Sequence, residues 1–165
     1  MEQSTLADAL KMSVQVALGA WDIQNSRLVK LIESLPEGRL SDEIAPGKNT
    51  GVYVLGHLVA VSDNMLPVLG LGERLFPHLD EVFLTNPEKS GLAKPPVSEL
   101  MANLHAVNKR LAEGFATLSP ANWLERHTAV SEADFAKEPH RNKLNLLLNR
   151  TGHIAYHLGQ LVWLK

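Results

Sequence analysis

Two of the seven histidines in this chain, His153 and His157, have the spacing of a metal site on a helix. Side chains four residues apart share one helical face, with about 5–6 Å between their Cβ atoms. Each imidazole can then offer one nitrogen to the same divalent cation, at about 2.0–2.1 Å. The spacing alone is a weak signal, because a motif this short also arises by chance.

The residues around this pair leave two interpretations open. Leucines recur on the same helical face, so we predict that His153 and His157 point into the core, with Asn149 and Gln160 nearby. A buried imidazole needs a hydrogen-bond partner or a metal. The pair is therefore either two core histidines bonded to Asn149 and Gln160, or part of a metal site.

A third histidine favours the metal site. His57 lies in the most apolar part of the chain, within residues 54–61. If this segment and the C-terminal segment form antiparallel helices, His57 lies level with the other two to within about two turns. We therefore predict a three-histidine metal site with open coordination positions, formed by His57, His153 and His157. The candidate residues around the metal or in the pocket are Asn149, Tyr156, Gln160 and Asn64. No catalytic residue is assigned, because no Asp or Glu is clearly placed beside the histidines.

The other residues that could do chemistry have simpler interpretations. His105 flanks an apolar stripe and is predicted to lie at its boundary. Three histidines in polar sequence are predicted to be solvated: His78, His127 and His140. The pair Asp80-Glu81 is predicted to be a solvated turn. The tryptophans are predicted to be core or interface anchors; they are Trp21, Trp123 and Trp163.

The elements that must position these side chains are helices. Apolar residues recur at helical spacing in four segments, and no alternating β pattern exceeds four residues. The predicted helices span residues 5–35, 51–69, 97–118 and 139–165. Pro67 is expected to kink or fray the end of the second helix, and Pro139 suits the first turn of the fourth. The predicted fold class is all-α, most simply a four-helix bundle in a single domain, residues 1–165.

A long connector, residues 70–96, separates the second and third helices, with room for a short helix around residues 79–84. A 20-residue helix is about 30 Å long, and about ten extended residues can run back along it. The connector therefore allows the second and third helices to lie parallel. The stretch 119–136, after the third helix, is predicted to have mixed structure.

The composition narrows the class of protein. Hydrophobic residues make up 45% of the 165 residues and charged residues 21%, as in an ordinary globular domain. The formal net charge of −2 argues against a nucleic-acid partner. The chain has no cysteine, which excludes disulfides, thiolate metal sites and cysteine nucleophiles. No signal peptide is evident, and the most apolar run, residues 52–61, is too short to span a bilayer. We expect a cytoplasmic protein without a membrane partner.

The motifs together resemble the DinB-like (DinB/YfiT) superfamily, and the similarity extends over nearly the whole chain. The residues that carry it are Gly56-His57-Leu58, His153-x-x-Tyr156-His157-x-Gly159-Gln160-Leu161, the Asn49-Thr50 lead into the second helix, and Leu118-Ser119-Pro120. The resemblance implies a four-helix bundle with up-down-down-up order and a long crossover between its second and third helices. It also implies a homodimer and a divalent metal, commonly zinc or nickel, bound by His57, His153 and His157.

Characterised relatives of this kind include S-transferases for low-molecular-weight thiols and a thiol-dependent maleylpyruvate isomerase. The resemblance therefore predicts a metal-dependent enzyme, a thiol S-transferase or a hydrolase, with a small-molecule substrate. Leu158 stands where some members carry Arg, so no substrate role passes to that position.

The alternative is a non-catalytic, stress-related dimeric bundle with a structural metal or a ligand pocket. Structural zinc sites usually have four protein ligands, so a site with three favours catalysis.

Overall fold

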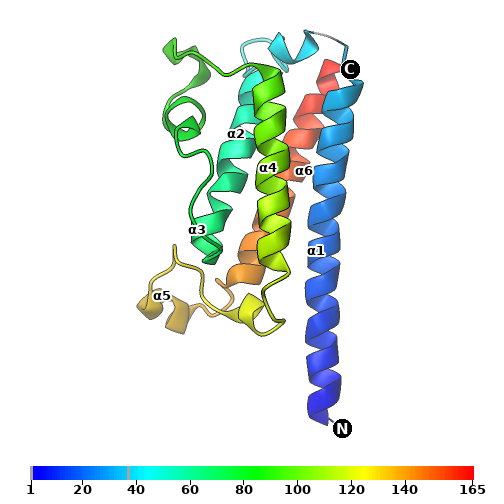
Figure 1. Ribbon diagram of the computed structural model, residues 1–165, viewed down its shortest axis with the longest axis vertical. Coiled ribbons are helices and arrows are strands. Elements are labelled where there is room, and N and C mark those ends of the chain that lie inside the picture. The colour runs from blue at the N-terminus through cyan, green and yellow to red at the C-terminus, as the bar shows by residue number, and fades with distance from the viewer. Residues whose placement is uncertain (1, 37) are drawn as a thin grey trace.

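The long helices of the protein pack side by side as a bundle (Figure 1). The computed structural model describes residues 2–36 and 38–165, with side chains from residue 5 onward; Met1 and Glu37, inside the predicted domain, lie outside the described residues. The helices are α1 (Glu2–Ser34), α2 (Gly51–Asp63), α3 (Met65–Leu69), α4 (Val97–Phe115), α5 (Glu132–Lys137) and α6 (Lys143–Leu161). Within that range the only β-structure is two isolated bridges, so the all-α prediction is confirmed.

The predicted helices and the observed ones differ most at prolines. The second predicted helix is divided at Asn64 into α2 and α3. Pro67 explains the division, because it has no N–H to donate and its ring crowds the carbonyl of Asp63 four residues earlier. The sequence predicts that the last helix begins at Pro139, but α6 begins at Lys143. Instead Asn142 caps α6 by accepting a hydrogen bond from the backbone N–H of Asn145 at 2.9 Å.

The core lies between the four long helices, where each contributes its apolar stripe. α1 packs mainly on α6, and α2 mainly on α4. Side chains that are at most 3% exposed come from all four of them: Trp21, Leu28, Leu55, Leu58, Leu104, Leu111, Leu147 and Ile154. This packing fixes the height and rotation of α2 and α6, the two helices that carry the predicted metal ligands.

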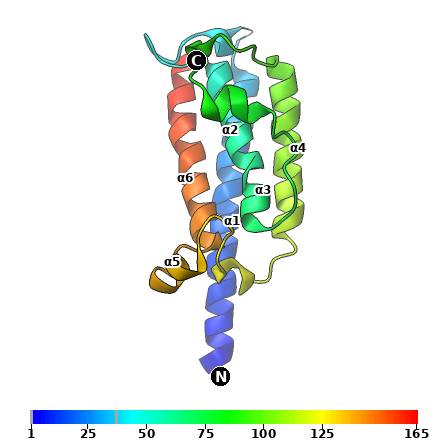
Figure 2. The ribbon, with the colours of Figure 1, turned by 90° about the vertical axis from the view of Figure 1, so that its left-hand side faces the viewer.

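The connector between α3 and α4 lies against α2 (Figure 2). It contains two short helical turns, η2 (Glu81–Thr85) and η3 (Glu88–Ser90), where the sequence predicted a connector with room for one short helix. The side chain of Phe83, in η2, is buried against α2. α5 lies in the stretch for which mixed structure was predicted.

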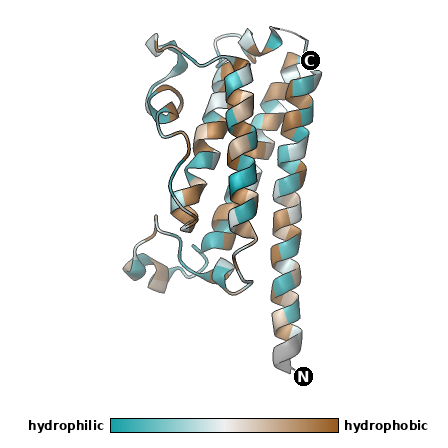
Figure 3. Ribbon diagram, in the orientation of Figure 1, coloured by the Kyte–Doolittle hydropathy of each residue, from teal (hydrophilic) through white to brown (hydrophobic). Residues whose placement is uncertain are grey.

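α1 extends well beyond the other helices at its N-terminal end (Figure 1). Figure 3 shows that apolar residues continue along this projecting part. Further along α1, Met12, Val16 and Ile23 are exposed and lie on one face, because they follow one another at intervals of four and seven residues. That face is opposite to the one that Trp21 and Leu28 bury in the core. α1 therefore has a second apolar stripe on its solvent side.

By length and composition alone, the apolar run Gly51–Leu69 could cross a membrane, with a mean hydropathy of 1.4. This run is the one interrupted at Asn64, and 72% of it is buried inside the bundle. Its burial among the other helices accounts for its apolar composition.

Candidate metal centre

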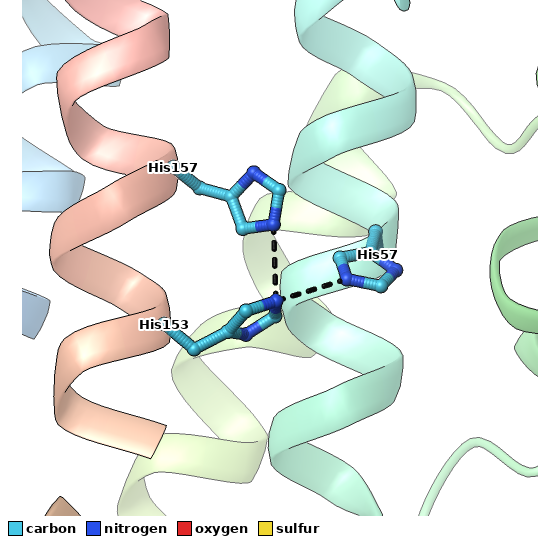
Figure 4. Close-up of side chains that lie close together, drawn as sticks. All are labelled: His57, His153 and His157. Carbon is cyan, nitrogen blue, oxygen red and sulfur yellow. Dashed lines mark hydrogen bonds between the residues drawn. The ribbon is translucent and has the colours of Figure 1, made fainter. Parts of the chain in front are cut away.

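The three predicted ligand histidines meet between α2 and α6 (Figure 4). His57 extends from α2, and His153 and His157 extend from successive turns of α6. Nε2 of His153 lies 3.3 Å from Nε2 of His57 and 3.0 Å from Nε2 of His157. All three side chains are half-buried. His57 on α2 thus lies at the same height as His153 and His157 on α6, as the sequence predicted, with their Nε2 atoms close together.

The outer ring nitrogens of two of these histidines have their own partners. Nδ1 of His57 lies 3.0 Å from the backbone carbonyl oxygen of Phe83, and Nδ1 of His157 lies 2.7 Å from Oε1 of Gln160. Both partners are hydrogen-bond acceptors, since the Gln160 amide nitrogen donates to the Tyr156 hydroxyl. Each Nδ1 must therefore carry the proton, and each Nε2 must present a lone pair toward the centre.

Hydrogen bonds among the three imidazoles cannot satisfy this arrangement. Nε2 of His153 can donate one proton at most, to His57 or to His157, and the other contact would then lack a proton. Three nitrogens bound at about 2.0–2.1 Å to a tetrahedral ion would lie about 3.3 Å apart, close to the separations found. The cluster therefore fits a divalent cation better than it fits a set of mutually bonded core histidines.

Burial also favours the neutral form of two of these imidazoles, His153 and His157, and metal binding requires that form. Desolvation lowers the pKa of His153 to about 4, and the neighbouring His157, His57 and Arg150 contribute to this lowering. Desolvation likewise lowers the pKa of His157, although the hydrogen bond to Gln160 acts in the opposite direction. Nδ1 of His153 is buried without a hydrogen-bond partner among the described residues.

A glycine allows the connector to reach His57. A Cβ atom at Gly56 would lie 2.3 Å from two ring carbons of Phe83, a distance that real Cβ atoms essentially never show. Without a side chain at Gly56, the Phe83 ring packs directly on α2 and its carbonyl oxygen comes within hydrogen-bond distance of His57. In the motif Gly56-His57, the glycine thus makes room for the Phe83 ring, and the histidine is a candidate metal ligand.

A buried ion pair holds the start of the connector to α2. Asp63 is fully buried and accepts hydrogen bonds from Nε of Arg74 at 3.1 Å and from the backbone N–H groups of Leu75 and Phe76 at 2.8 and 3.0 Å. Arg74 in turn pairs with Asp80, through Nη2 at 2.6 Å. The prediction of a solvated pair Asp80-Glu81 thus holds for Glu81, which is exposed, but Asp80 is only partly exposed and pairs with Arg74. An Asp inside an apolar run was the sequence signal for Asp63, because such a carboxylate needs buried partners.

The residues predicted around the metal fall into two groups. Gln160 contacts His157 directly, and the Tyr156 hydroxyl supports Gln160 at 3.0 Å. Asn149 is exposed and bonds to Asn145 of its own helix rather than to the histidines. Asn64 is half-buried at the end of α2, two turns from His57.

The other histidines lie apart from the centre. His78 and His140 are exposed, as predicted, and His105, which was predicted at the boundary of an apolar stripe, is exposed too. The prediction that His127 is solvated is wrong, because its side chain is half-buried and its Nδ1 is buried. Desolvation lowers the pKa of His127, and the nearby Arg141 and Arg126 contribute to this lowering. Among the tryptophans, Trp21 and Trp123 are buried in the core, whereas Trp163 is exposed.

Comparison with known proteins agrees with this geometry. The profile of the DinB superfamily matches residues 20–161, which include α2, α6 and all three histidines. No curated protein matches the chain. The match covers most of the chain, and the chain therefore belongs to the DinB superfamily.

Proposed function

We propose that this protein is a divalent-metal-dependent enzyme, a low-molecular-weight-thiol S-transferase or a hydrolase, that acts on a small molecule. The observation that carries the proposal is the convergence of three Nε2 atoms, two of which must present lone pairs. The residues that would hold the ion are His57, His153 and His157. Zinc and nickel are the metals that the family resemblance favours.

The donor set supports catalysis over a purely structural role. Three neutral imidazoles leave coordination positions open, whereas structural zinc sites usually use four protein ligands. When bound in such a site, a divalent ion lowers the pKa of a water or thiol bound to it. The chain has no cysteine, so a reacting thiol would come from the substrate.

The surrounding residues would keep this site in one arrangement. Phe83 and Gln160 fix which nitrogen of His57 and of His157 carries a proton, and so direct both Nε2 atoms inward. The bond between Gln160 and Tyr156 orients the Gln160 amide. These residues act as positioning residues, because they touch the histidines and not the reacting atoms.

The family resemblance also leads us to infer an up-down-down-up helix order and a homodimer. The order is supported by the connector between α3 and α4, which is long enough to return along α2. The dimer is supported by the exposed stripe of Met12, Val16 and Ile23 on the solvent side of α1. A second copy of α1 would bury this stripe.

A screen of the metal-loaded protein tests the enzymatic proposal. Protein purified without a histidine tag is loaded with zinc or nickel and offered low-molecular-weight thiols together with electrophilic acceptors, and in parallel simple esters and amides. We expect turnover that depends on the metal, is lost in His153→Ala and is kept in His105→Ala. Metal-loaded protein without any turnover would favour the non-catalytic, stress-related bundle.

A further inference from the structure

A pocket of about 420 Å³ opens beside the metal centre. Its walls come from the C-terminal part of α6 and the turn that follows it, with Tyr156, His157, Gln160 and Trp163, and from the loop before α2, with Lys48. His157 thus faces both the metal centre and the pocket. A molecule in this pocket would contact His157, one of the three residues that would hold the metal.

The pocket has an uncompensated positive charge. Among the described residues that line it, Lys48 is the only Lys, Arg, Asp or Glu. The two carboxylates that contact the loop around Lys48 have other partners: Glu43 accepts from the Gly47 backbone N–H at 2.7 Å and pairs with Lys89 at 3.5 Å. Glu88 bonds to Thr50 and Lys94. The ammonium group of Lys48 is therefore available to a bound anion.

The loop that carries Lys48 is held in a defined shape. The backbone N–H of Ile44 donates to the carbonyl of Asn49 at 3.0 Å, and that of Lys48 donates to the carbonyl of Ala45 at 2.9 Å. Gly47 turns the chain with a φ of 75°, a conformation that favours glycine. The backbone of Lys48 thus belongs to a hydrogen-bonded turn that lines the pocket.

Two exposed aromatic rings provide the apolar part of the pocket. Trp163 is 78% exposed and Tyr156 63% exposed, whereas aromatic rings are more often buried. The Tyr156 oxygen accepts a hydrogen bond from Gln160, so its own O–H proton remains available to a ligand. The pocket thus combines a cation, a hydroxyl donor and flat apolar surfaces within reach of His157.

We infer that this pocket binds a carboxylate-bearing small molecule with an apolar, planar body, whose carboxylate pairs with Lys48 and whose body lies on Trp163 and Tyr156. The inference rests on the proposed function, since it identifies the pocket as the substrate side of the metal centre. It predicts that substrates are organic anions rather than neutral or cationic molecules.

The test compares two probes of nearly equal size and shape, 3-phenylpropanoate and its neutral amide, at low ionic strength. Trp21 and Trp123 are 3% and 1% exposed, so shielding from acrylamide quenching reports mainly on Trp163. We expect the acid to bind about fivefold more tightly than the amide, the size of effect that an exposed ion pair gives. Lys48→Met should remove this preference and Lys48→Arg should retain it. Lys109→Met, which removes an exposed lysine on α4, should not change it.

Each titration is run on zinc-loaded and on metal-free protein, because a carboxylate can also bind to a metal. A preference for the acid that persists without metal and depends on Lys48 supports the inference. Equal affinity for acid and amide, or a Lys48→Met variant that behaves like Lys109→Met, would overturn it. Shielding of Trp163 that rises with protein concentration in the absence of probe would also overturn it, because a second copy would then cover the pocket.

The zinc content of the same samples keeps the two proposals separate. Protein that binds the acid through Lys48 but holds no zinc would contradict the metal proposal alone. Protein that holds zinc but does not discriminate between the probes would contradict only the substrate inference.

Discussion

The backbone carbonyl of Phe83 accepts a hydrogen bond from Nδ1 of His57 at 3.0 Å, and so joins the connector to the candidate metal centre. This contact leaves the lone pair of His57 on Nε2, where the other two histidines converge. Phe83, in the connector, therefore determines which ring nitrogen of His57 carries the proton.

The close approach of Phe83 to α2 can be tested through Gly56. In Gly56→Ala the new methyl group would meet the Phe83 ring, so η2 must shift and His57 would lose its acceptor. We expect unfolding to become easier by about 1–3 kcal/mol, as for other overpacked sites, together with weaker zinc binding. Urea unfolding and zinc titration measure the two effects.

The matched control is Gly152→Ala, because a Cβ there would meet nothing within 4 Å. Gly152 lies in α6 next to His153, and alanine favours a helix over glycine by up to about 1 kcal/mol. This variant should be as stable as the wild type or more stable. Equal behaviour of the two variants would contradict the role assigned to Gly56.

The buried carboxylate of Asp63 should be essential for holding the connector. Asp63→Ala removes the acceptor of Arg74 and of two backbone N–H groups, and we expect a loss of about 3 kcal/mol in the free energy of unfolding. Asp42→Ala removes an exposed pair with Arg39 and should cost less than about 1 kcal/mol. Chemical unfolding of both variants decides the question, and similar losses would argue against a special role for Asp63.

The stability of the metal-free protein should depend on pH through His153. Its pKa is about 4 in the folded protein, against 6.5 for an unperturbed imidazole. Between these values the unfolded chain binds a proton that the folded protein does not, so the free energy of unfolding falls as the pH drops from about 6.5 to about 4. Urea unfolding in the presence of a chelator should detect this loss, and His153→Leu should reduce it. The same pH dependence in both proteins would refute the assignment.

The exposed stripe on α1 predicts the oligomeric state. Val16→Glu places a charge in the centre of the stripe and should convert a dimer into a monomer, because a buried unpaired carboxylate is costly. Gln15→Glu adds the same charge beside the stripe and should leave the dimer intact. Sedimentation equilibrium distinguishes the two states, and a dimer that survives Val16→Glu would place the interface elsewhere.

The sequence predicted the helices and the three histidines because both depend on regular spacing. The apolar period locates α1, α4 and α6, and the spacing of four from His153 to His157 suffices to place them on one face. His57 could be added only through the relative direction of two distant helices.

What the sequence could not predict lies mainly in the connector. The path of residues 70–96 depends on tertiary contacts of Asp63, Arg74 and Phe83, and no local period encodes them. For the same reason the sequence predicts a solvated Asp80, although this residue pairs with Arg74. The division of α2 from α3 was foreseeable as a kink near Pro67, but its position at Asn64 was not.

The most direct test of the metal centre is zinc K-edge X-ray absorption on protein loaded with one equivalent of zinc. The account predicts three imidazole nitrogens at about 2.0–2.1 Å in the wild type, and the same shell in His105→Ala. His57→Ala should show two protein nitrogens or no bound zinc. A wild-type spectrum without imidazole ligands, or an unchanged spectrum in His57→Ala, would contradict it.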